Sequence, residues 1–203
     1  MRVLVLGGSG RTGRHLLAAL TRAGHSPVLL GRRAPEGWVG EVRLGDPGDP
    51  DAVAGALAGV DAAMSCLGST RGGPVCLRAT RAVIAAAPRD LPYLVVGGAA
   101  VDAPGDAKGL GDRAVGALMR LVAGAMLAER QAEHDALRAS ALAWTFLRPP
   151  RLTDGPGTGR WAFTDDRPAA MRIDRADLAR AMLEAAGRSD MGRRAPFVAG
   201  LPA

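Results

Sequence analysis

Short apolar runs alternate along the chain with longer stretches whose apolar residues recur at helical spacing. Several of the short runs lack polar residues, as is typical of parallel strands buried on both faces. They predict strands at residues 3–6, 28–30, 41–44, 62–65, 94–96, 144–147 and 196–199. The stretches between them predict helices at residues 12–22, 50–58, 76–87, 118–139 and 175–186. This alternation is typical of a doubly wound α/β fold, so we expect a mostly parallel sheet of about six to seven strands with flanking helices.

Two segments fit neither pattern, and each follows the carboxyl end of a predicted strand. Residues 101–117 are rich in Gly and Asp, and residues 151–170 carry several more glycines and prolines. Ligands of open α/β sheets bind outside the carboxyl ends of the strands, so we expect both segments to border a substrate. No repeat, low-complexity tract or domain boundary divides the sequence, and residues 1–203 are expected to form a single domain.

The first predicted strand runs directly into a glycine-rich turn and then into the first predicted helix. The turn carries Gly7, Gly10 and Gly13 as a Gly-x-x-Gly-x-x-Gly string. In a Rossmann-type dinucleotide site the first glycine allows a sharp turn and the second lets the backbone approach a pyrophosphate. The third lets the helix settle on the strand, with its N-terminus aimed at the anion. The string alone is weak evidence, but its place between a strand and a helix is the context that a nucleotide site requires.

The end of the second predicted strand bears on the choice of cofactor. An NAD-preferring domain usually places an acidic residue there, because a carboxylate accepts hydrogen bonds from the ribose hydroxyls. This chain has Arg32 and Arg33 instead. Two guanidiniums can bind an adenosine 2′-phosphate with charge-assisted hydrogen bonds, which favours NADP(H) over NAD(H). The alternative is that both arginines are merely solvated in a loop.

Two further strand ends are expected to reach the same site. Asp46 follows the third strand, where a carboxylate can accept a hydrogen bond from the adenine amino group. Cys66, Leu67 and Gly68 close the fourth strand, where the backbone would pass beneath the adenine ribose. We interpret Cys66 as a wall of the site and not as a nucleophile, because the sequence nominates no base beside it.

The charge balance raises the question of a nucleic-acid partner. The formal net charge is +6, and Lys108 is the only lysine among 26 basic residues. The arginines are scattered from Arg2 to Arg194 without a dense block or interleaved aromatic residues. Nucleic-acid binding needs clustered cations, so we interpret the arginines as solvated helix faces and expect no nucleic-acid partner.

Other partners and compartments are constrained by what the sequence contains. Cys66 and Cys76 do not make a disulfide framework, and no Cys/His pairs stand at zinc-ligand spacing, so no metal site is expected. No run approaches the ~20 apolar residues of a membrane span, and the first apolar run is too short for a signal peptide. We therefore expect a cytoplasmic protein that binds no membrane, either as a monomer or as a homodimer paired through the 118–139 helix. The charges on the second half of that helix, Glu129, Arg130, Glu133 and Arg138, are expected to form exposed pairs.

The chain resembles the atypical short-chain dehydrogenases/reductases, the NmrA-like and flavin or biliverdin reductase-like NAD(P)H-binding proteins. The resemblance covers nearly the full length and is most specific at residues 129–159, where a charged helix, an Ala-Trp-Thr-Phe-Leu-Arg-Pro strand and a glycine-rich loop follow one another. It implies that the pyrophosphate is held by the turn, and that the nicotinamide is bordered by the ends of the strands that follow. The implied turn residues are Gly7, Gly8, Ser9, Gly10, Arg11, Thr12 and Gly13, and the implied nicotinamide neighbours are Gly97, Gly98, Arg148 and Pro149.

The catalytic residues of typical family members are missing. These members protonate the substrate with a Tyr-x-x-x-Lys pair backed by a serine. Here Tyr93 is the only tyrosine and has no lysine four residues on, and the usual serine is replaced by Gly97-Gly98. Other acid or base candidates remain, but each also has a non-catalytic interpretation. His134 would be an exposed helix residue, and the acids of the two loops would form turns. The candidates are His134, Asp102, Lys108, Asp154 and Asp165.

Two functions remain open from the sequence, and a third is disfavoured. The leading interpretation is an NADP(H)-dependent oxidoreductase that transfers hydride to a small conjugated or carbonyl substrate between residues 101–117 and 151–170. The second is a non-catalytic NADP(H) sensor, which the missing proton donor favours. A sugar-nucleotide epimerase would need the Tyr/Lys pair and a larger substrate lobe. The catalytic residues and the substrate are not specified by the sequence.

Overall fold

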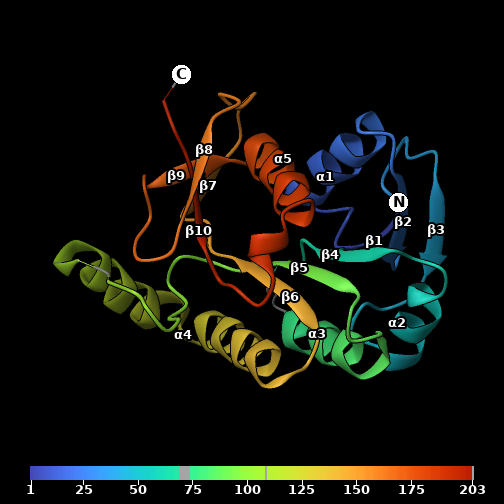
Figure 1. Ribbon diagram of the computed structural model, residues 1–203, viewed down its shortest axis with the longest axis horizontal. Coiled ribbons are helices and arrows are strands. Elements are labelled where there is room, and N and C mark those ends of the chain that lie inside the picture. Colours follow the sequence, from blue (N-terminus) through green and yellow to red (C-terminus); the bar gives the residue numbers. More distant parts are fainter. Residues whose placement is uncertain (69–73, 108, 203) are drawn as a thin grey trace.

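The computed structural model describes residues 1–68, 74–107 and 109–202, and it confirms the expected doubly wound α/β class. Five helices lie on the two faces of a six-stranded parallel sheet with the strand order β3-β2-β1-β4-β5-β6 (Figure 1). The sheet strands are β1 (Arg2–Leu6), β2 (Ser26–Gly31), β3 (Glu41–Leu44), β4 (Ala62–Ser65), β5 (Pro92–Val96) and β6 (Ala143–Leu147). The helices are α1 (Arg11–Arg22), α2 (Pro50–Leu57), α3 (Val75–Ala86), α4 (Leu110–Ala139) and α5 (Arg175–Ala186).

The central strands are apolar because helices cover both of their faces. In the middle of the sheet, Val5 on β1 lies opposite Leu29 on β2 and opposite Met64 on β4. The strand order reverses beside β1, which places the carboxyl ends of β1 and β4 next to one another. This is the topological switch point at which doubly wound folds bind their ligands.

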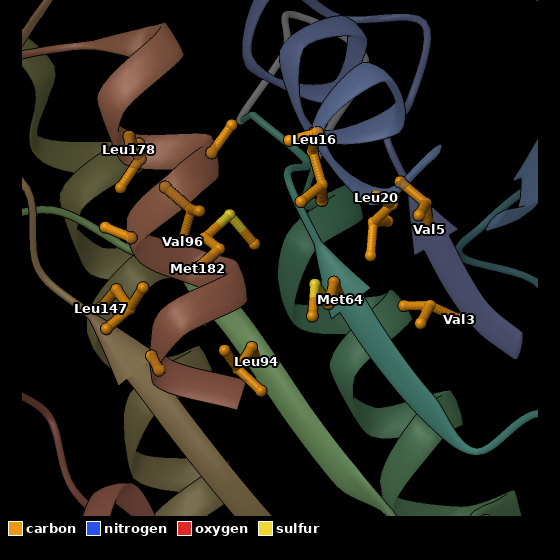
Figure 2. Close-up of a cluster of buried hydrophobic side chains, with 14 of the residues drawn as sticks. Val3, Val5, Leu16, Leu20, Met64, Leu94, Val96, Leu147, Leu178 and Met182 are labelled. Carbon is orange, nitrogen blue, oxygen red and sulfur yellow. The ribbon is translucent and has the colours of Figure 1, made fainter. Parts of the chain in front are cut away.

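One face of the sheet is covered by α1 and α5, whose side chains meet those of the strands in a continuous apolar layer (Figure 2). Leu16 and Leu20 from α1 lie over β1 and β4, and Leu178 and Met182 from α5 lie over β5 and β6. All four side chains are fully buried. Burial of such a side chain stabilises the fold by about 1.5–3 kcal/mol, so this layer fixes α1, and with it the glycine turn, on the sheet.

The opposite face is covered by α2, α3 and the inner part of α4 (Figure 1). Val53 and Val83 pack there against the strands, and Leu137 anchors α4. Phe146 and Trp144 point from β6 into the same layer. Small residues of these helices, among them Ala56, Ala79 and Ala82, let them lie close to the sheet.

The predicted seventh strand belongs to a different sheet. β10 (Phe197–Gly200) pairs antiparallel with β8 (Trp161–Thr164), although its start also lies beside β6 through the parallel bridge between Arg148 and Phe197. No strand was predicted at β8, so the sequence did not indicate this pairing. Antiparallel pairing with β8 draws the strand away from the main sheet.

The 151–170 segment is more regular than its glycines and prolines predict. It contains β7 (Arg151–Thr153) and β8, and β7 pairs in parallel with β9 (Arg172–Asp174), a strand that was not predicted. A short 3₁₀ turn (Ser189–Met191) follows α5. β7 and β9 have only three residues each, which carry too little periodicity to be detected in a sequence.

The fourth helix begins earlier than predicted, at Leu110 rather than at residue 118, so most of residues 110–117 is helical and not loop. Its backbone breaks at Ala123, where φ is −135° and ψ is 33°. The part before this kink reaches beyond the sheet layers (Figure 1) and exposes Leu118, Leu121 and Val122. The part after the kink packs on α3.

Candidate cofactor site

The turn between β1 and α1 has the backbone geometry that its glycines predict. Gly7 has a φ of +80°, a conformation that residues with a side chain rarely adopt. A Cβ atom on Gly7 would lie 2.8 Å from the backbone nitrogen of Leu67 and 2.9 Å from the carbonyl oxygen of Cys66. The turn therefore depends on glycine both for its direction and for its closeness to the end of β4.

Gly13 joins α1 to the strand. A Cβ atom there would lie 2.2 Å from the carbonyl oxygen of Gly7, and one on Gly8 would lie 2.5 Å from Cδ1 of Leu29. Gly10 is the residue before the first turn of α1, and it has no side chain that could accept a hydrogen bond from the N–H groups of that turn. The first turn also holds no acidic residue. The first N–H groups of a helix carry a partial positive charge and favour an anion. The structure thus presents a helix N-terminus suited to a phosphate, in a cradle that any larger residue would fill.

The side chains of the turn differ in their surroundings. Thr12 is buried, and the Ser9 carbonyl oxygen accepts a hydrogen bond from Nε of Arg14 at 3.3 Å. Arg11 is exposed and pairs with Asp154 at 3.2 Å, and Asp154 also pairs with Arg175 at 2.7 Å. These ion pairs tie the glycine turn to the segment that follows β7.

Arg32 and Arg33 stand just after β2 and are exposed. Neither forms a hydrogen bond or an ion pair within the described part of the chain, although most other arginines do. Two guanidiniums without a carboxylate partner at the second strand end create a local excess of positive charge. This is the electrostatic setting that an adenosine 2′-phosphate requires.

Asp46 lies after β3 and is held in a turn. One carboxylate oxygen accepts a hydrogen bond from the backbone N–H of Gly48 at 2.9 Å, and the other lies 3.9 Å from the guanidinium of Arg78. The turn therefore fixes the direction of the carboxylate. Its contact with adenine stays a prediction.

Cys66, Leu67 and Gly68 continue β4 beneath the glycine turn, as expected for a wall of the site. Burial raises the pKa of the Cys66 thiol to about 12, against a smaller opposing effect of Arg130. The sulfur lies 3.7 Å from the sulfur of Met182. A thiol with so high a pKa is not a nucleophile at neutral pH, which agrees with the interpretation made from the sequence.

The ends of β5 and β6 lie side by side. The backbone N–H of Gly97 donates to the carbonyl oxygen of Leu147 at 2.8 Å, and that of Ala99 donates to the carbonyl oxygen of Pro149 at 2.9 Å. A Cβ atom on Gly97 would lie 2.1 Å from the ring of Phe146, whereas one on Gly98 would meet no atom within 4 Å. The structure thus brings together Gly97, Gly98 and Pro149 as the resemblance implies.

The side chain of Arg148 points elsewhere. It is 1% exposed and donates hydrogen bonds to the carbonyl oxygens of Ala195 and Val101, at 2.6 and 3.2 Å. It also forms an ion pair of 2.7 Å with Asp106 and stacks 3.8 Å above the ring of Phe197. Its guanidinium therefore joins the segments around β6 and does not face the predicted nicotinamide position, and its backbone N–H donates to the carbonyl oxygen of Pro196 at 2.9 Å.

The expected exposed charge pairs on α4 are wrong: three of the four side chains are buried, and the exposed fourth, Arg138, forms no ion pair with a described carboxylate. Glu129 is 9% exposed and Glu133 is 0% exposed, and Arg130 lies between them. Glu129 accepts hydrogen bonds from the backbone of Cys76 and Leu77 at 2.7 and 3.3 Å, and thereby caps α3. The missed signal is spacing: both glutamates stand on the same helical face as the buried Leu137, four and eight residues before it.

Glu133 and Arg130 connect this buried cluster to the candidate cofactor site. Glu133 accepts a hydrogen bond from the hydroxyl of Thr80 at 2.8 Å, and that hydroxyl lies 3.0 Å from the hydroxyl of Tyr93. Arg130 donates to Glu133 at 2.5 Å and to the carbonyl oxygen of Leu67. Arg130 thus fixes the backbone at Leu67, one of the residues predicted to form a wall of the cofactor site.

The acid and base candidates are spread over the molecule. His134 is not an exposed helix residue but is 1% exposed, with its ring centre 5.1 Å from that of Phe146. Asp154 and Asp165 pair with arginines, and the backbone of Asp102 is bonded to Gln131. Lys108 lies outside the described residues. Tyr93 is fully buried, and burial followed by the charge of Glu133 raises its pKa.

Comparison with known proteins agrees with the geometry. The family model described as NAD(P)H-binding matches residues 7–188. No curated protein matches the sequence. The structure of ChuY, an anaerobillin reductase from Escherichia coli O157:H7, is similar with a TM-score of 0.80 and 19% identity, over 100% of both chains. A protein of Streptococcus pneumoniae provisionally named an NADH-flavin reductase has a TM-score of 0.80 and 18% identity, over 99% of this chain and 100% of that one.

A protein of Bacillus halodurans, provisionally named an NAD-dependent epimerase/dehydratase, has a TM-score of 0.78 and 21% identity, over 100% of this chain and 95% of its own. The chain therefore belongs to the family whose model is described as NAD(P)H-binding, and its cofactor is a nicotinamide dinucleotide. Among residues 1–68, 74–107 and 109–202, no helix combines the length and apolar character needed to cross a membrane.

Proposed function

We propose that this protein is an NADP(H)-dependent oxidoreductase that reduces a small conjugated or carbonyl substrate. The observation that carries the proposal is the pair of exposed, unpartnered guanidiniums of Arg32 and Arg33, next to an uncapped helix N-terminus in a glycine cradle. The backbone N–H groups at the start of α1, in the cradle that Gly7, Gly10 and Gly13 leave open, would hold the pyrophosphate, and the arginines would hold the 2′-phosphate. The nicotinamide, when bound, supplies the hydride.

A cavity of about 400 Å³ supports a substrate beside the predicted nicotinamide position. It lies between the segment after β5 and the kinked part of α4, and Ala100 on its wall stands two residues after Gly98. Its mostly apolar lining suits a conjugated ring system: Ala100, Asp102, Gly124, Leu127, Ala128 and Gln131. Positioning against the cofactor would then supply much of the catalysis.

The source of the proton separates this proposal from its alternative. Tyr93 is fully buried, is bonded to Thr80 and has a raised pKa, so it cannot protonate a substrate in the cavity. Reduction would then take its proton from water, which flavin- and bilin-type acceptors permit. The second candidate, a non-catalytic NADP(H) sensor, is favoured by the same observation because a sensor needs no proton donor.

The first experiment measures cofactor binding. Fluorescence titrations compare NADPH with NADH for the wild type and for Arg32→Ala/Arg33→Ala. We expect NADPH to bind at least about tenfold more tightly than NADH, and the double variant to lose that preference, because charge-assisted bonds to phosphate are strong. The control is Arg22→Ala/Arg81→Ala, which removes the same charge from two exposed positions on α1 and α3. Equal affinities for both nucleotides in the wild type would contradict the NADP(H) assignment.

The second experiment separates enzyme from sensor. Absorbance at the nicotinamide band is followed while flavins, quinones and bilins are added to the NADPH complex. Turnover with one of them identifies an oxidoreductase, and Ala128→Trp, which fills the cavity, should then abolish turnover and leave NADPH binding unchanged. Tight NADPH binding without turnover across the whole panel would support the sensor instead.

A further inference from the structure

A second cavity, of about 510 Å³, lies at the outer edge of the sheet beyond β6. It is bounded by the second half of α4, by the segment before β10, and by the residues after β5 and β8. Of the residues predicted to hold the cofactor, Arg148 is the one that forms part of its wall. Its charged and aromatic lining residues are His134, Arg138, Trp144, Arg148, Asp165, Arg193 and Arg194.

Three buried nitrogen atoms at this cavity have no hydrogen-bond partner in the described part of the chain. They are Nδ1 and Nε2 of His134 and Nε1 of Trp144. The two residues are only 1% and 4% exposed, and their rings meet edge to face at 5.8 Å. Buried polar groups in folded proteins are nearly always hydrogen-bonded, so these three nitrogens still have the capacity to bind a polar group that enters the cavity.

The charges around the cavity indicate the sign of such a group. Arg148 is paired with Asp106, and Arg194 is paired with Asp165 and Asp190. Arg138 and Arg193 form no ion pair with any described carboxylate. Arg193 instead donates to carbonyl oxygens at the end of α4, those of Ser140 and Leu142, at 2.8 and 3.4 Å. The wall therefore carries positive charge that the surrounding carboxylates leave uncompensated.

We propose that this cavity is a binding site for a small organic anion, with a carboxylate or phosphate group held by Trp144, His134 and Arg138. The indole N–H and one imidazole N–H would donate to the anionic oxygens, and Arg138 would supply the opposite charge. Ala103, Pro104 and Ala195 provide room for an apolar part of the ligand. The site is distinct from the glycine turn, and Arg148 and the adjoining Pro149 connect the two regions through the backbone.

The test uses the indole N–H signal of Trp144 in two-dimensional ¹⁵N–¹H spectra of the full chain. The sequence has three tryptophans, and Trp144→Phe assigns the signal by its loss. Inorganic phosphate, acetate and benzoate are titrated separately, with neutral benzamide as the control ligand. We expect at least one anion to shift the Trp144 signal saturably while benzamide does not. The anion that binds more tightly distinguishes a carboxylate ligand from a phosphate ligand.

A variant pair tests the role of charge. Arg138→Gln should weaken anion binding about tenfold, because it removes a charge-assisted contact. The control Arg81→Gln removes an equivalent exposed helix charge on α3 and should leave binding unchanged. The proposal is overturned if no anion shifts the Trp144 signal, if benzamide shifts it equally, or if Arg138→Gln binds as the wild type does. None of these results depends on NADPH binding or turnover.

Discussion

Arg130 donates a hydrogen bond of 2.5 Å to Glu133, one turn further along α4, and this ion pair is almost wholly inside the protein. Removing one partner of a buried pair leaves the other charge without compensation, which typically costs about 3–5 kcal/mol. Arg130→Met should therefore lower the free energy of unfolding by about that amount. Urea denaturation of the purified variant measures it.

The double variant Arg130→Met/Glu133→Leu is the matched control for this pair. Replacing both charges by apolar groups of similar volume is often nearly neutral, so the double variant should recover most of the lost stability. If Arg130→Met unfolds at the same urea concentration as the wild type, the pair is not the stabilising element that the structure indicates.

The contact between Gly97 and Phe146 provides a second test, on the strand end predicted to border the nicotinamide. Because a Cβ atom on Gly97 would lie 2.1 Å from the aromatic ring, Gly97→Ala must displace that ring. Overpacking of this kind costs about 1–3 kcal/mol. Thermal unfolding should show the loss, and Phe146→Leu in the same chain should reduce it.

The neighbouring glycine is the control for the Gly97 variant. A Cβ atom on Gly98 would meet no atom within 4 Å, so Gly98→Ala should change the stability by less than about 0.5 kcal/mol. Equal losses in the two variants would indicate that backbone freedom, and not contact with Phe146, makes glycine necessary at Gly97.

The parts of the fold that the sequence predicted are those with a strong local signal. Buried parallel strands read as short apolar runs, and all six strands of the main sheet were predicted, including the edge strand β3, which carries Glu41 and Arg43. The glycine turn was equally clear, because Gly7 and Gly13 are required by backbone geometry alone. The short strands β7 and β9 and the antiparallel partner of β10 were missed, since their pairing is decided by tertiary contacts.

The errors at the candidate site have a different origin. Charged residues on a helix were expected to face water. Instead, Arg130 pairs with Glu133 inside the protein, and Glu129 accepts a hydrogen bond from the N-terminus of α3. His134 was expected to be exposed for the same reason. The hydrogen bonds that compensate these charges join elements about fifty residues apart, and such contacts do not change the local periodicity of the sequence. Only the spacing relative to Leu137 indicated the buried face.

Thiol reactivity provides a third prediction. Cys66 is half-buried, and its surroundings raise the pKa of its thiol to about 12, while Cys76 is fully buried on α3. Because the thiolate is the reactive form, neither cysteine should react appreciably with a thiol reagent within minutes at pH 7.5. Both should react at once in guanidinium chloride. Rapid labelling of Cys66 in the native protein, located by mass spectrometry, would contradict its assignment as an inert wall.

The pH dependence of stability provides the last prediction. Burial lowers the pKa of His134, and Arg148 and Arg138 add to this effect, whereas Asp135 and Asp106 oppose it. The folded protein therefore holds this proton less tightly than the unfolded chain, whose histidine pKa is about 6.5. The stabilisation from the neutral ring is complete above that pH and is lost as the pH falls below it.

Unfolding measured at pH 7.5 and at pH 5.5 should thus show a fall in stability that is larger for the wild type than for His134→Leu. Between pH 7.5 and 8.5 the histidine is neutral in both states, so the two proteins should have the same slope there. A wild type and a variant with parallel curves down to pH 5.5 would mean that the ring takes up a proton in the folded state as readily as in water. The wall of the sheet-edge cavity would then be more hydrated than the burial of His134 and Trp144 indicates.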